Sequence, residues 1–201
     1  MAKQIHPSAF VEEGATLSDG VSVWHLAHVR KGATLGPSVS VGKDVYIDAG
    51  VNIGEGTRIQ NSVNIYQGVE IGRFCFVGPA VVFTNDQHPR VGRKSWQVTK
   101  TLLEDGCSLG AGCIIRCGVT IGSFSLIGAG AVVTKDIPPF CLVTGLPAEL
   151  THRVCACGDT TLPLIAWLDE LVRPCCQQNL LKPVLDLAMK KIEDMKKKIT
   201  K

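Results

Sequence analysis

The stretch VSVGKDVYIDAGVNIGEGTRIQNSVNI, residues 39–65, repeats one pattern every six residues, with Val41, Ile47 and Ile53 at equivalent positions. The period extends in both directions and keeps an apolar residue at each step. Its other members are Ile5, Val11, Leu17, Val23, Val29, Leu35, Ile59, Ile65, Ile71, Val77 and Phe83, and, two residues out of phase, Leu103, Leu109, Ile115, Ile121, Ile127 and Val133. Such a hexad period predicts short β-strands that bury their apolar faces by stacking on copies of themselves.

A second position of the hexad, two residues before each apolar residue, is always small or β-branched, as at Ala27, Val45 and Thr57. Residues i and i−2 of a strand lie on the same face, so both positions point into one interior. A narrow tube filled by one branched and one small side chain per strand explains this pairing. Ordinary strands of a β-sandwich would not hold a fixed six-residue period. We therefore predict an all-β parallel β-helix built from hexapeptide repeats.

Glycine recurs directly after the apolar residue, where the chain is expected to turn tightly and a Cβ would clash. These glycines are Gly36, Gly42, Gly54, Gly72, Gly78, Gly110, Gly122 and Gly128. They support the same six-residue period.

Composition limits the classes of function. The formal charge of +3 on 201 residues is too small to indicate a nucleic-acid partner. The N-terminal sequence contains no long apolar run, so we expect neither a signal peptide nor a membrane span, and a cytoplasmic location. Of the nine cysteines, Cys75, Cys107 and Cys113 occupy the small core position, and Cys117 lies on the same face as Ile115. They are expected to be free thiols that pack as small hydrophobic residues.

The period divides the chain into a β-helix domain over residues 1–150 and an extension over residues 151–201. Within the domain, residues 84–102 abandon the hexad and form a polar excursion loop. The prolines of the segment 135–150 are expected to end the regular structure. In the extension, residues 162–172 predict a short helix, and apolar residues at three- and four-residue spacing from Leu181 onward predict an amphipathic helix.

The extension also carries four cysteines, Cys155, Cys157, Cys175 and Cys176. Their number matches a zinc site, but a C-x-C pair followed by an adjacent pair departs from the usual C-x2-C spacing. The spacing therefore favours four unrelated thiols or a decayed zinc ribbon over a bound metal. We predict no metal site.

Four segments resemble a known group of enzymes. The run VFTNDQHPR (82–90) with the loop after it, and IGAGAVVTKDIPPFCLVTGLPAEL (127–150), resemble the trimeric left-handed β-helix acetyltransferases that use acetyl-coenzyme A (acetyl-CoA). Within that group, VWHLAHV (23–29) and IQNSVNIYQGV (59–69) resemble the N-acetyltransferases of nucleotide-linked 3-amino sugars. The similarity covers residues 5 to about 150.

The resemblance implies a left-handed β-helix, a homotrimer with active sites between subunits, and acetyl-CoA as cosubstrate along the coils of one wall. The acceptor would be a nucleotide-linked amino sugar, a 3-amino sugar or 3-amino uronic acid, used in surface polysaccharide biosynthesis. The expected coenzyme contacts are Gly110, Gly128, Ala129, Lys135 and Arg153. This chain has Glu149 where the family usually has a basic residue, so Lys135 or Arg153 is expected to replace that contact.

Amide formation needs a neutral amine, a polarised thioester carbonyl and correct alignment of the two. The resemblance places Asn85, of the FTN motif, beside the reacting groups, where its amide can orient them but cannot act as a base. His88 or His25 can accept the proton, and so can the departing thiolate of the coenzyme. The expected substrate-binding residues are Asp86, Arg90, Arg93, Lys94 and His28, with the arginines suited to a pyrophosphate or carboxylate.

Two other functions remain open. A zinc carbonic anhydrase on the same β-helix would need His25, His28 and His88 to converge, but the spacing of the first two does not return them to one corner of the tube. A non-enzymatic scaffold would bind no acetyl-CoA. The loop argues against a scaffold, because an excursion of about nineteen residues in a compact domain usually has a function.

Overall fold

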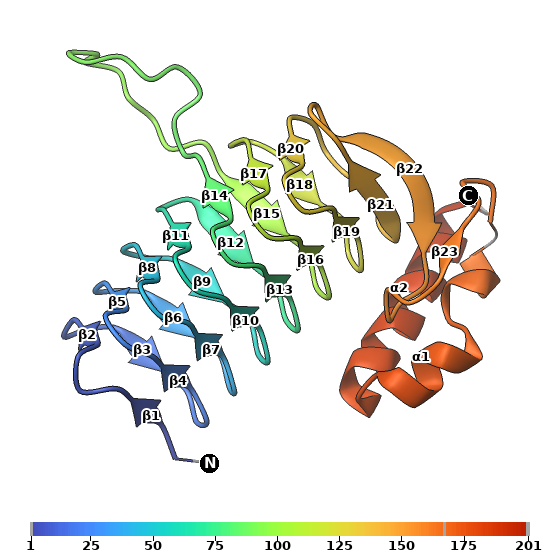
Figure 1. The fold of residues 1–201 in the computed structure, drawn as a ribbon, viewed down its shortest axis with the longest axis horizontal. Helices are drawn as coiled ribbons and strands as arrows, with labels where there is room; N and C mark the ends of the chain where they lie inside the picture. Colours follow the sequence, from blue (N-terminus) through green and yellow to red (C-terminus); the bar gives the residue numbers. More distant parts are fainter. Residues whose placement is uncertain (1, 167, 200–201) are drawn as a thin grey trace.

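The computed structural model describes residues 2–166 and 168–199. The chain winds into stacked coils, and each coil contributes one short strand to each of three parallel sheets along a prism (Figure 1). Residues pair with partners 18 positions on, as Ile5 does with Val23, so each coil comprises three hexads. The fold is a left-handed parallel β-helix, as the sequence predicts.

The three sheets contain all described strands. Sheet A consists of β1 (Gln4–Ile5), β4 (Ser22–Val23), β7 (Ser40–Val41), β10 (Arg58–Ile59), β13 (Phe76–Val77), β16 (Ser108–Leu109), β19 (Leu126–Ile127), β21 (Cys141–Thr144), β22 (Glu149–Val154) and β23 (Thr161–Leu162). Sheet B consists of β2 (Phe10–Val11), β5 (His28–Val29), β8 (Tyr46–Ile47), β11 (Asn64–Ile65), β14 (Val82–Phe83), β17 (Ile114–Ile115) and β20 (Val132–Val133). Sheet C consists of β3 (Thr16–Leu17), β6 (Thr34–Leu35), β9 (Asn52–Ile53), β12 (Val69–Ile71), β15 (Thr101–Leu103) and β18 (Thr120–Ile121).

The interior of the prism holds the two predicted side-chain positions of the hexad. The apolar residues that recur every six positions are called here the ladder residues. From Leu17 onward they are buried, and so are the small residues two positions before each one that follows Leu17, including Cys75, Cys107 and Cys113. The first two ladder residues differ from the prediction. Ile5 is 46% exposed and Val11 is only partly buried, because no coil lies below them to cover their side chains.

The glycine that follows eight of the ladder residues has a more specific cause than a tight turn. A Cβ built on Gly54 would lie 2.5 Å from the backbone carbon of Gly72 in the next coil. Positive φ angles occur instead two residues later, as at Gly56 (67°). Close approach of neighbouring coils therefore requires glycine directly after the ladder residue. The sharp turn of the chain lies two residues further on.

The closing segment continues the regular structure further than the prolines suggest. Beyond Pro138 and Pro139, β21 still pairs in parallel with β19 and adds another strand to sheet A. The chain then reverses, and β22 pairs with β21 in the antiparallel direction. β22 runs across the expected domain boundary at residue 150, and β23 follows it in the same sheet.

The extension is helical only after these strands. The helix expected over residues 162–172 is wrong: Leu162 pairs with Arg153 in the sheet, Pro163 follows, and only the 3-10 helix η1 (Leu168–Leu171) forms among the described residues of that segment. The amphipathic helix is confirmed as α2 (Lys182–Ile199), preceded by the short α1 (Pro174–Asn179). No described helix is both long enough and apolar enough to span a bilayer.

The extension docks on two phenylalanines of the prism. Phe124 and Phe140 are buried, stack with ring centroids 5.2 Å apart, and have φ angles of 58° and 57°. They form a second, small core with Leu162, Leu171, Ala188 and Ile192. A left-handed conformation is unfavourable for a side chain as large as Phe, so this packing offsets a local cost.

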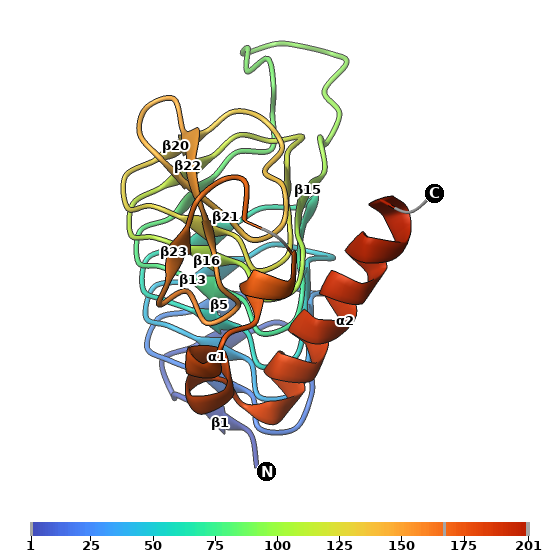
Figure 2. The same ribbon diagram turned by 90° about the vertical axis from the view of Figure 1, so that its right-hand side faces the viewer.

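Helix α2 lies beside the prism (Figure 2), and an ion pair joins the two. Lys191 Nζ donates to Glu104 Oε2 at 2.7 Å, and the backbone N–H and hydroxyl of Ser123 donate to the same oxygen at 2.9 and 2.6 Å. Burial would raise the pKa of Glu104, but these hydrogen bonds outweigh it and hold that pKa below its ordinary value. The carboxylate is therefore the form that the folded state favours.

We predict that Glu104→Gln weakens the docking of α2 by about 1 kcal/mol. Because the folded pKa is lowered, this contribution is present above the ordinary carboxyl value of about 4.3 and is lost as pH falls through the folded value. Hydrogen exchange of the α2 amides should be faster in the variant at neutral pH and equal in both proteins in acid. Glu70→Gln, which removes an exposed pair with Lys100, is the control and should change nothing in α2. Equal exchange in Glu104→Gln and wild type at neutral pH would contradict the prediction.

Candidate functional site

The loop predicted from the sequence leaves the prism between β14 and β15 (Figure 1). Ile71 pairs with Leu103, 32 residues on, in place of the usual 18. The excursion thus covers residues 84–100, because Thr101 and Leu102 already belong to β15. It leaves from the corner that joins sheet B to sheet C, called here the B–C corner.

The base of the loop is held firmly. The N–H of Cys117 donates to Thr84 Oγ1 at 2.9 Å, and the N–H of Thr99 donates to the carbonyl of Asn85 at 3.4 Å. On the returning limb, Val98 lies against Gly68, so closely that a Cβ there would overlap its side chain. Asn85 is consequently a half-buried residue with a fixed backbone at the point where the loop begins.

The tip of the loop is exposed and carries most of the predicted substrate-binding residues. The N–H of His88 donates to Asp86 Oδ1 at 2.8 Å, and Arg93 Nη1 donates to the carbonyl of His88 at 3.0 Å. Arg90 Nη1 donates to the carbonyl of Pro89 at 3.2 Å. Within the described part of the chain, no carboxylate forms an ion pair with Arg90, Arg93 or Lys94. The tip therefore presents cationic groups that are available to an anion.

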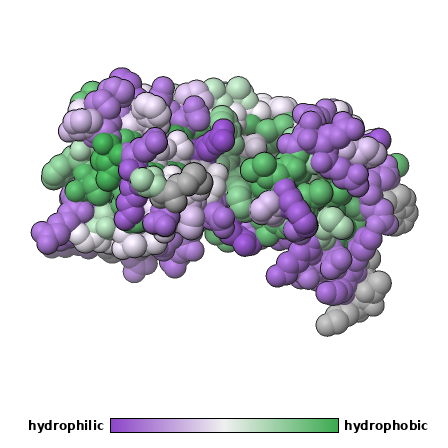
Figure 3. All heavy atoms as spheres, turned by 90° about the horizontal axis from the view of Figure 1, so that it is seen from below, coloured by the Kyte–Doolittle hydropathy of each residue, from purple (hydrophilic) through white to green (hydrophobic). Residues whose placement is uncertain are grey.

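His25 lies elsewhere, in the first coils of the prism. It occupies the corner that joins sheet A to sheet B, the A–B corner, where its ring stacks on His6 with centroids 3.6 Å apart. The ring of Trp24 lies nearly parallel to that of His25, with centroids 6.2 Å apart. Figure 3 shows apolar surface at this end of the prism, separated by polar side chains from the apolar surface of the extension.

His28 belongs to a polar network that the sequence prediction missed. Its Nε2 lies 2.8 Å from Glu12 Oε1, and Arg30 bridges Glu12 and Asp48 at 3.3 and 3.2 Å. The N–H of Lys31 and the side chain of His28 lower the pKa of Glu12. Glu12, Arg30 and Asp48 are 18 residues apart, which places them in one column of the B–C corner. The 18-residue spacing of these three charged residues is the sequence signal that could have revealed the network.

Three of the expected coenzyme contacts do come together. Gly110, Gly128 and Ala129 lie on the A–B corner in successive coils, and a Cβ on Gly110 would lie 2.5 Å from the backbone nitrogen of Ala129. Ala129 itself is exposed. Glycine and alanine leave this corner smooth, so that a ligand can approach the backbone closely.

Lys135 and Arg153 do not join these three residues. Lys135 Nζ lies 3.3 Å from a carboxylate oxygen of Glu149, and both side chains are exposed. The guanidinium of Arg153 donates to the carbonyls of Pro139 and Leu164 at 3.4 and 3.2 Å, at the corner between sheets C and A. Glu149 therefore forms an ion pair with Lys135, one of the two residues that were expected to replace the basic side chain usual at position 149.

The predicted catalytic residues Asn85, His88 and His25, and the predicted substrate-binding residue His28, divide into two groups within one chain. Asn85 and His88 share the loop. His25 lies on the A–B corner of an earlier coil, and His28 lies on the outer face of sheet B. The three histidines His25, His28 and His88 thus do not converge on one point. A site that uses both groups would need a second copy of the chain.

Comparison with known proteins identifies the architecture. Residues 100–135 match the family model described as bacterial transferase hexapeptide (six repeats). A solved hexapeptide-repeat acetyltransferase of Vibrio cholerae, in complex with acetyl-CoA, is 30% identical with a TM-score of 0.54 over 61% of this chain and 70% of its own. The chain belongs to the hexapeptide-repeat transferase family.

Two other acetyltransferases are similar over part of this chain. The GDP-perosamine N-acetyltransferase of Caulobacter crescentus, solved as a point mutant with CoA and GDP-perosamine, is 26% identical with a TM-score of 0.53, over 76% of this chain and 58% of its own. The dTDP-3-amino-3,6-dideoxy-alpha-D-galactopyranose 3-N-acetyltransferase of Aneurinibacillus thermoaerophilus is 43% identical over 58 residues, which are 29% of this chain. That match spans only 30% of the curated relative's length.

Proposed function

We propose that this hexapeptide-repeat protein is an acetyltransferase that uses acetyl-CoA to acetylate the amino group of a nucleotide-linked amino sugar. The observation that carries the proposal is the similarity to two proteins whose names specify such acceptors, one of them a 3-amino sugar. The cationic loop tip supports it, because guanidinium groups bind pyrophosphate and carboxylate oxygens in two-point contacts. Surface polysaccharide biosynthesis is the use that we propose for the product.

The reaction forms one bond and breaks another. The sugar nitrogen attacks the thioester carbonyl carbon, the carbon–sulfur bond breaks, and the nitrogen loses a proton as the amide forms. The sulfur leaves as a thiolate, which can take that proton and depart as the free thiol of CoA. The protein then needs to align the two reactants and polarise the carbonyl, and a strong base is not required. His88 is the alternative proton acceptor on the loop.

We assign the alignment of the reactants to Asn85. Its backbone is held by Thr99 and by the neighbouring Thr84, at the point in the chain where the rigid strand meets the loop. A positioning group is effective when its support is rigid, because a small displacement of the reactants costs much of the rate. An amide can donate to the carbonyl oxygen or accept from the amine without changing charge.

We predict that Asn85→Ala lowers kcat by ~10²-fold through lost alignment and carbonyl polarisation, with fold and assembly intact. Arg90→Ala should instead raise KM for the nucleotide sugar, because an anion clamp contributes mainly to binding. Release of free thiol from acetyl-CoA, measured against a panel of nucleotide-linked amino sugars, separates the two effects.

The matched control is Gln97→Ala, an exposed loop residue, which should change neither constant. Wild-type protein that bound acetyl-CoA but released no thiol with any nucleotide-linked amino sugar would refute the acceptor class. Unchanged kcat and KM in both Asn85→Ala and Arg90→Ala would move the active site elsewhere on the prism.

The smooth A–B corner is the wall that we propose for the coenzyme. Substitutions at Gly110 or Gly128 cannot test this, because a Cβ would meet the next coil or Thr144. Ala129 is exposed, so Ala129→Tyr should leave the fold intact and weaken acetyl-CoA binding by ~10-fold or more through steric exclusion, about 1.4 kcal/mol. Titration calorimetry measures the affinity, with the exposed Gln178→Tyr on α1 as control. Equal affinity in Ala129→Tyr and wild type would place the coenzyme on another wall.

We further propose a homotrimer. The loop tip projects away from its own prism (Figure 1), and Val82 and Ile114, neighbours on the outer face of sheet B, are 46% and 37% exposed. Side contacts between prisms would cover such residues and bring the loop of one chain to the wall of another. Light scattering should give the molar mass of three chains. A stable monomer with full transferase activity would contradict the proposal.

A further inference from the structure

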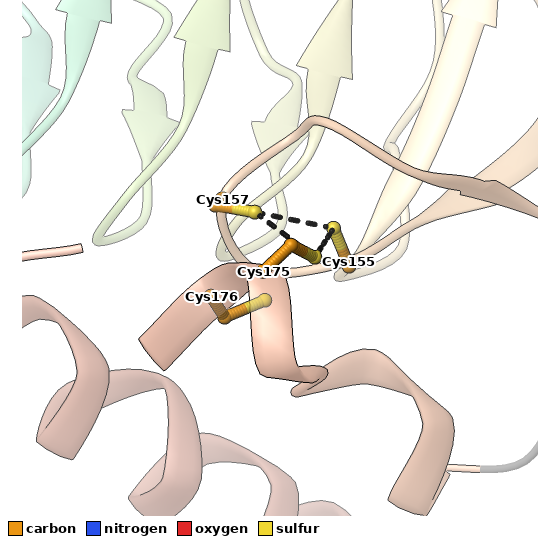
Figure 4. A group of neighbouring side chains, drawn as sticks. All are labelled: Cys155, Cys157, Cys175 and Cys176. Atoms are coloured by element: carbon orange, nitrogen blue, oxygen red, sulfur yellow. Dashed lines mark hydrogen bonds between the residues drawn. The ribbon is translucent and has the colours of Figure 1, made fainter. Parts of the chain in front are cut away.

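The four cysteines of the extension converge on one point. Cys155 follows β22, Cys157 lies in the turn before β23, and Cys175 and Cys176 lie in the first turn of α1 (Figure 4). All four sulfur atoms lie within 4.8 Å of one another. Segments about twenty residues apart in sequence thus place four potential ligands together, despite the unusual C-x-C and C-C spacing.

The distances fit a single tetrahedral ion. Zinc–thiolate bonds of about 2.3 Å put the sulfurs of a tetrahedron about 3.8 Å apart. In the structure Cys155 and Cys157 are separated by 3.4 Å, Cys157 and Cys175 by 3.7 Å, and Cys155 and Cys175 by 3.9 Å. A disulfide would need about 2.05 Å, and all nine cysteines are free.

Backbone amides donate hydrogen bonds to two of the four sulfur atoms. The N–H of Thr160 points at Cys155 Sγ at 3.3 Å, and the N–H of Arg173 points at Cys176 Sγ at 3.4 Å. Such outer hydrogen bonds orient metal ligands and stabilise their charge. Cys155 and Cys176 are buried, so the group lies inside the extension with only Cys157 and Cys175 partly exposed.

We propose that Cys155, Cys157, Cys175 and Cys176 bind one structural zinc ion. Binding would release the thiol protons to solvent and leave four thiolates around the metal. Four protein ligands fill the tetrahedron, so the site has no open position for a substrate and is structural rather than catalytic.

The role follows from what the ligands connect. Two ligands belong to the turn between the last strands of sheet A, and two belong to the helix that leads to α2. Among the described residues, the apolar core beneath the extension contains only six buried side chains, two of them from the prism itself. A metal joining both segments would supply stability that this small core lacks.

Elemental analysis of the full-length protein, purified under reducing conditions, tests the site directly. We expect one zinc ion per chain in the wild type and loss of most of it in Cys157→Ser and in Cys175→Ser. The matched control is Cys113→Ala. Cys113 is buried in the prism, away from the four thiols, and the equivalent position of the next coil is already an alanine, Ala131. It should retain its zinc.

A second measurement does not depend on the variants folding. Titration of the wild type with a thiol-specific mercurial should release zinc, and hydrogen exchange of residues 155–180 should rise while the coils of the prism stay protected. Wild-type protein without zinc, both as purified and after reduction and incubation with zinc chloride, would overturn the proposal. So would iron in its place, or disulfides between these cysteines in the protein as purified. None of these outcomes depends on transferase activity.

Discussion

The whole molecule depends on the fact that a two-residue strand cannot bury its side chains alone. Each coil presents one branched and one small residue per strand to the interior, and only the coils above and below complete their burial. Ile5 illustrates this constraint: no coil lies below it, and the Ile5 side chain stays exposed. Regular stacking is therefore the source of both the stability and the rigidity of the prism.

This rigidity shapes the candidate site. The loop can leave the prism only at a corner, and Thr84, Gly68 and Thr99 hold its two ends against neighbouring coils. Beyond those contacts the tip projects from the prism and carries cations that, among the described residues, have no carboxylate partner. The proposed positioning residue Asn85 and the proposed recognition segment thus lie at the B–C corner of one chain, while the smooth corner at Ala129 lies on a different edge. The arrangement accords with sites completed between subunits.

The fold was readable from the sequence because each hexad repeats the same burial, so that many weak signals agree. The loop could be found for the same reason, as the only long break in that period. Tertiary contacts outside the repeat left no such signal. The stacking of Phe124 on Phe140, the strand at Leu162 and the convergence of Cys155 with Cys175 arise where the chain folds back on itself. The local spacing of the cysteines even argued against a metal site. The pair Cys155 and Cys157 is separated in sequence from the pair Cys175 and Cys176 by β23 and η1, so the four do not form a C-x2-C motif. The column of Glu12, Arg30 and Asp48 was detectable, but only at a spacing of 18 residues.

The 18-residue register also limits how the length of such a chain can change during evolution. Loss or gain of a single hexad would keep the interior filled, since every hexad has the same inward pattern. It would nevertheless shift every later strand to the next wall, and outward columns such as that of Glu12 and Arg30 would be scattered over different faces. Whole coils can be added or removed without this effect, and so can segments that leave and return at one corner, as residues 84–100 do. Relatives of this protein are therefore expected to differ in length by multiples of 18 residues or by corner insertions, with few intermediate cases.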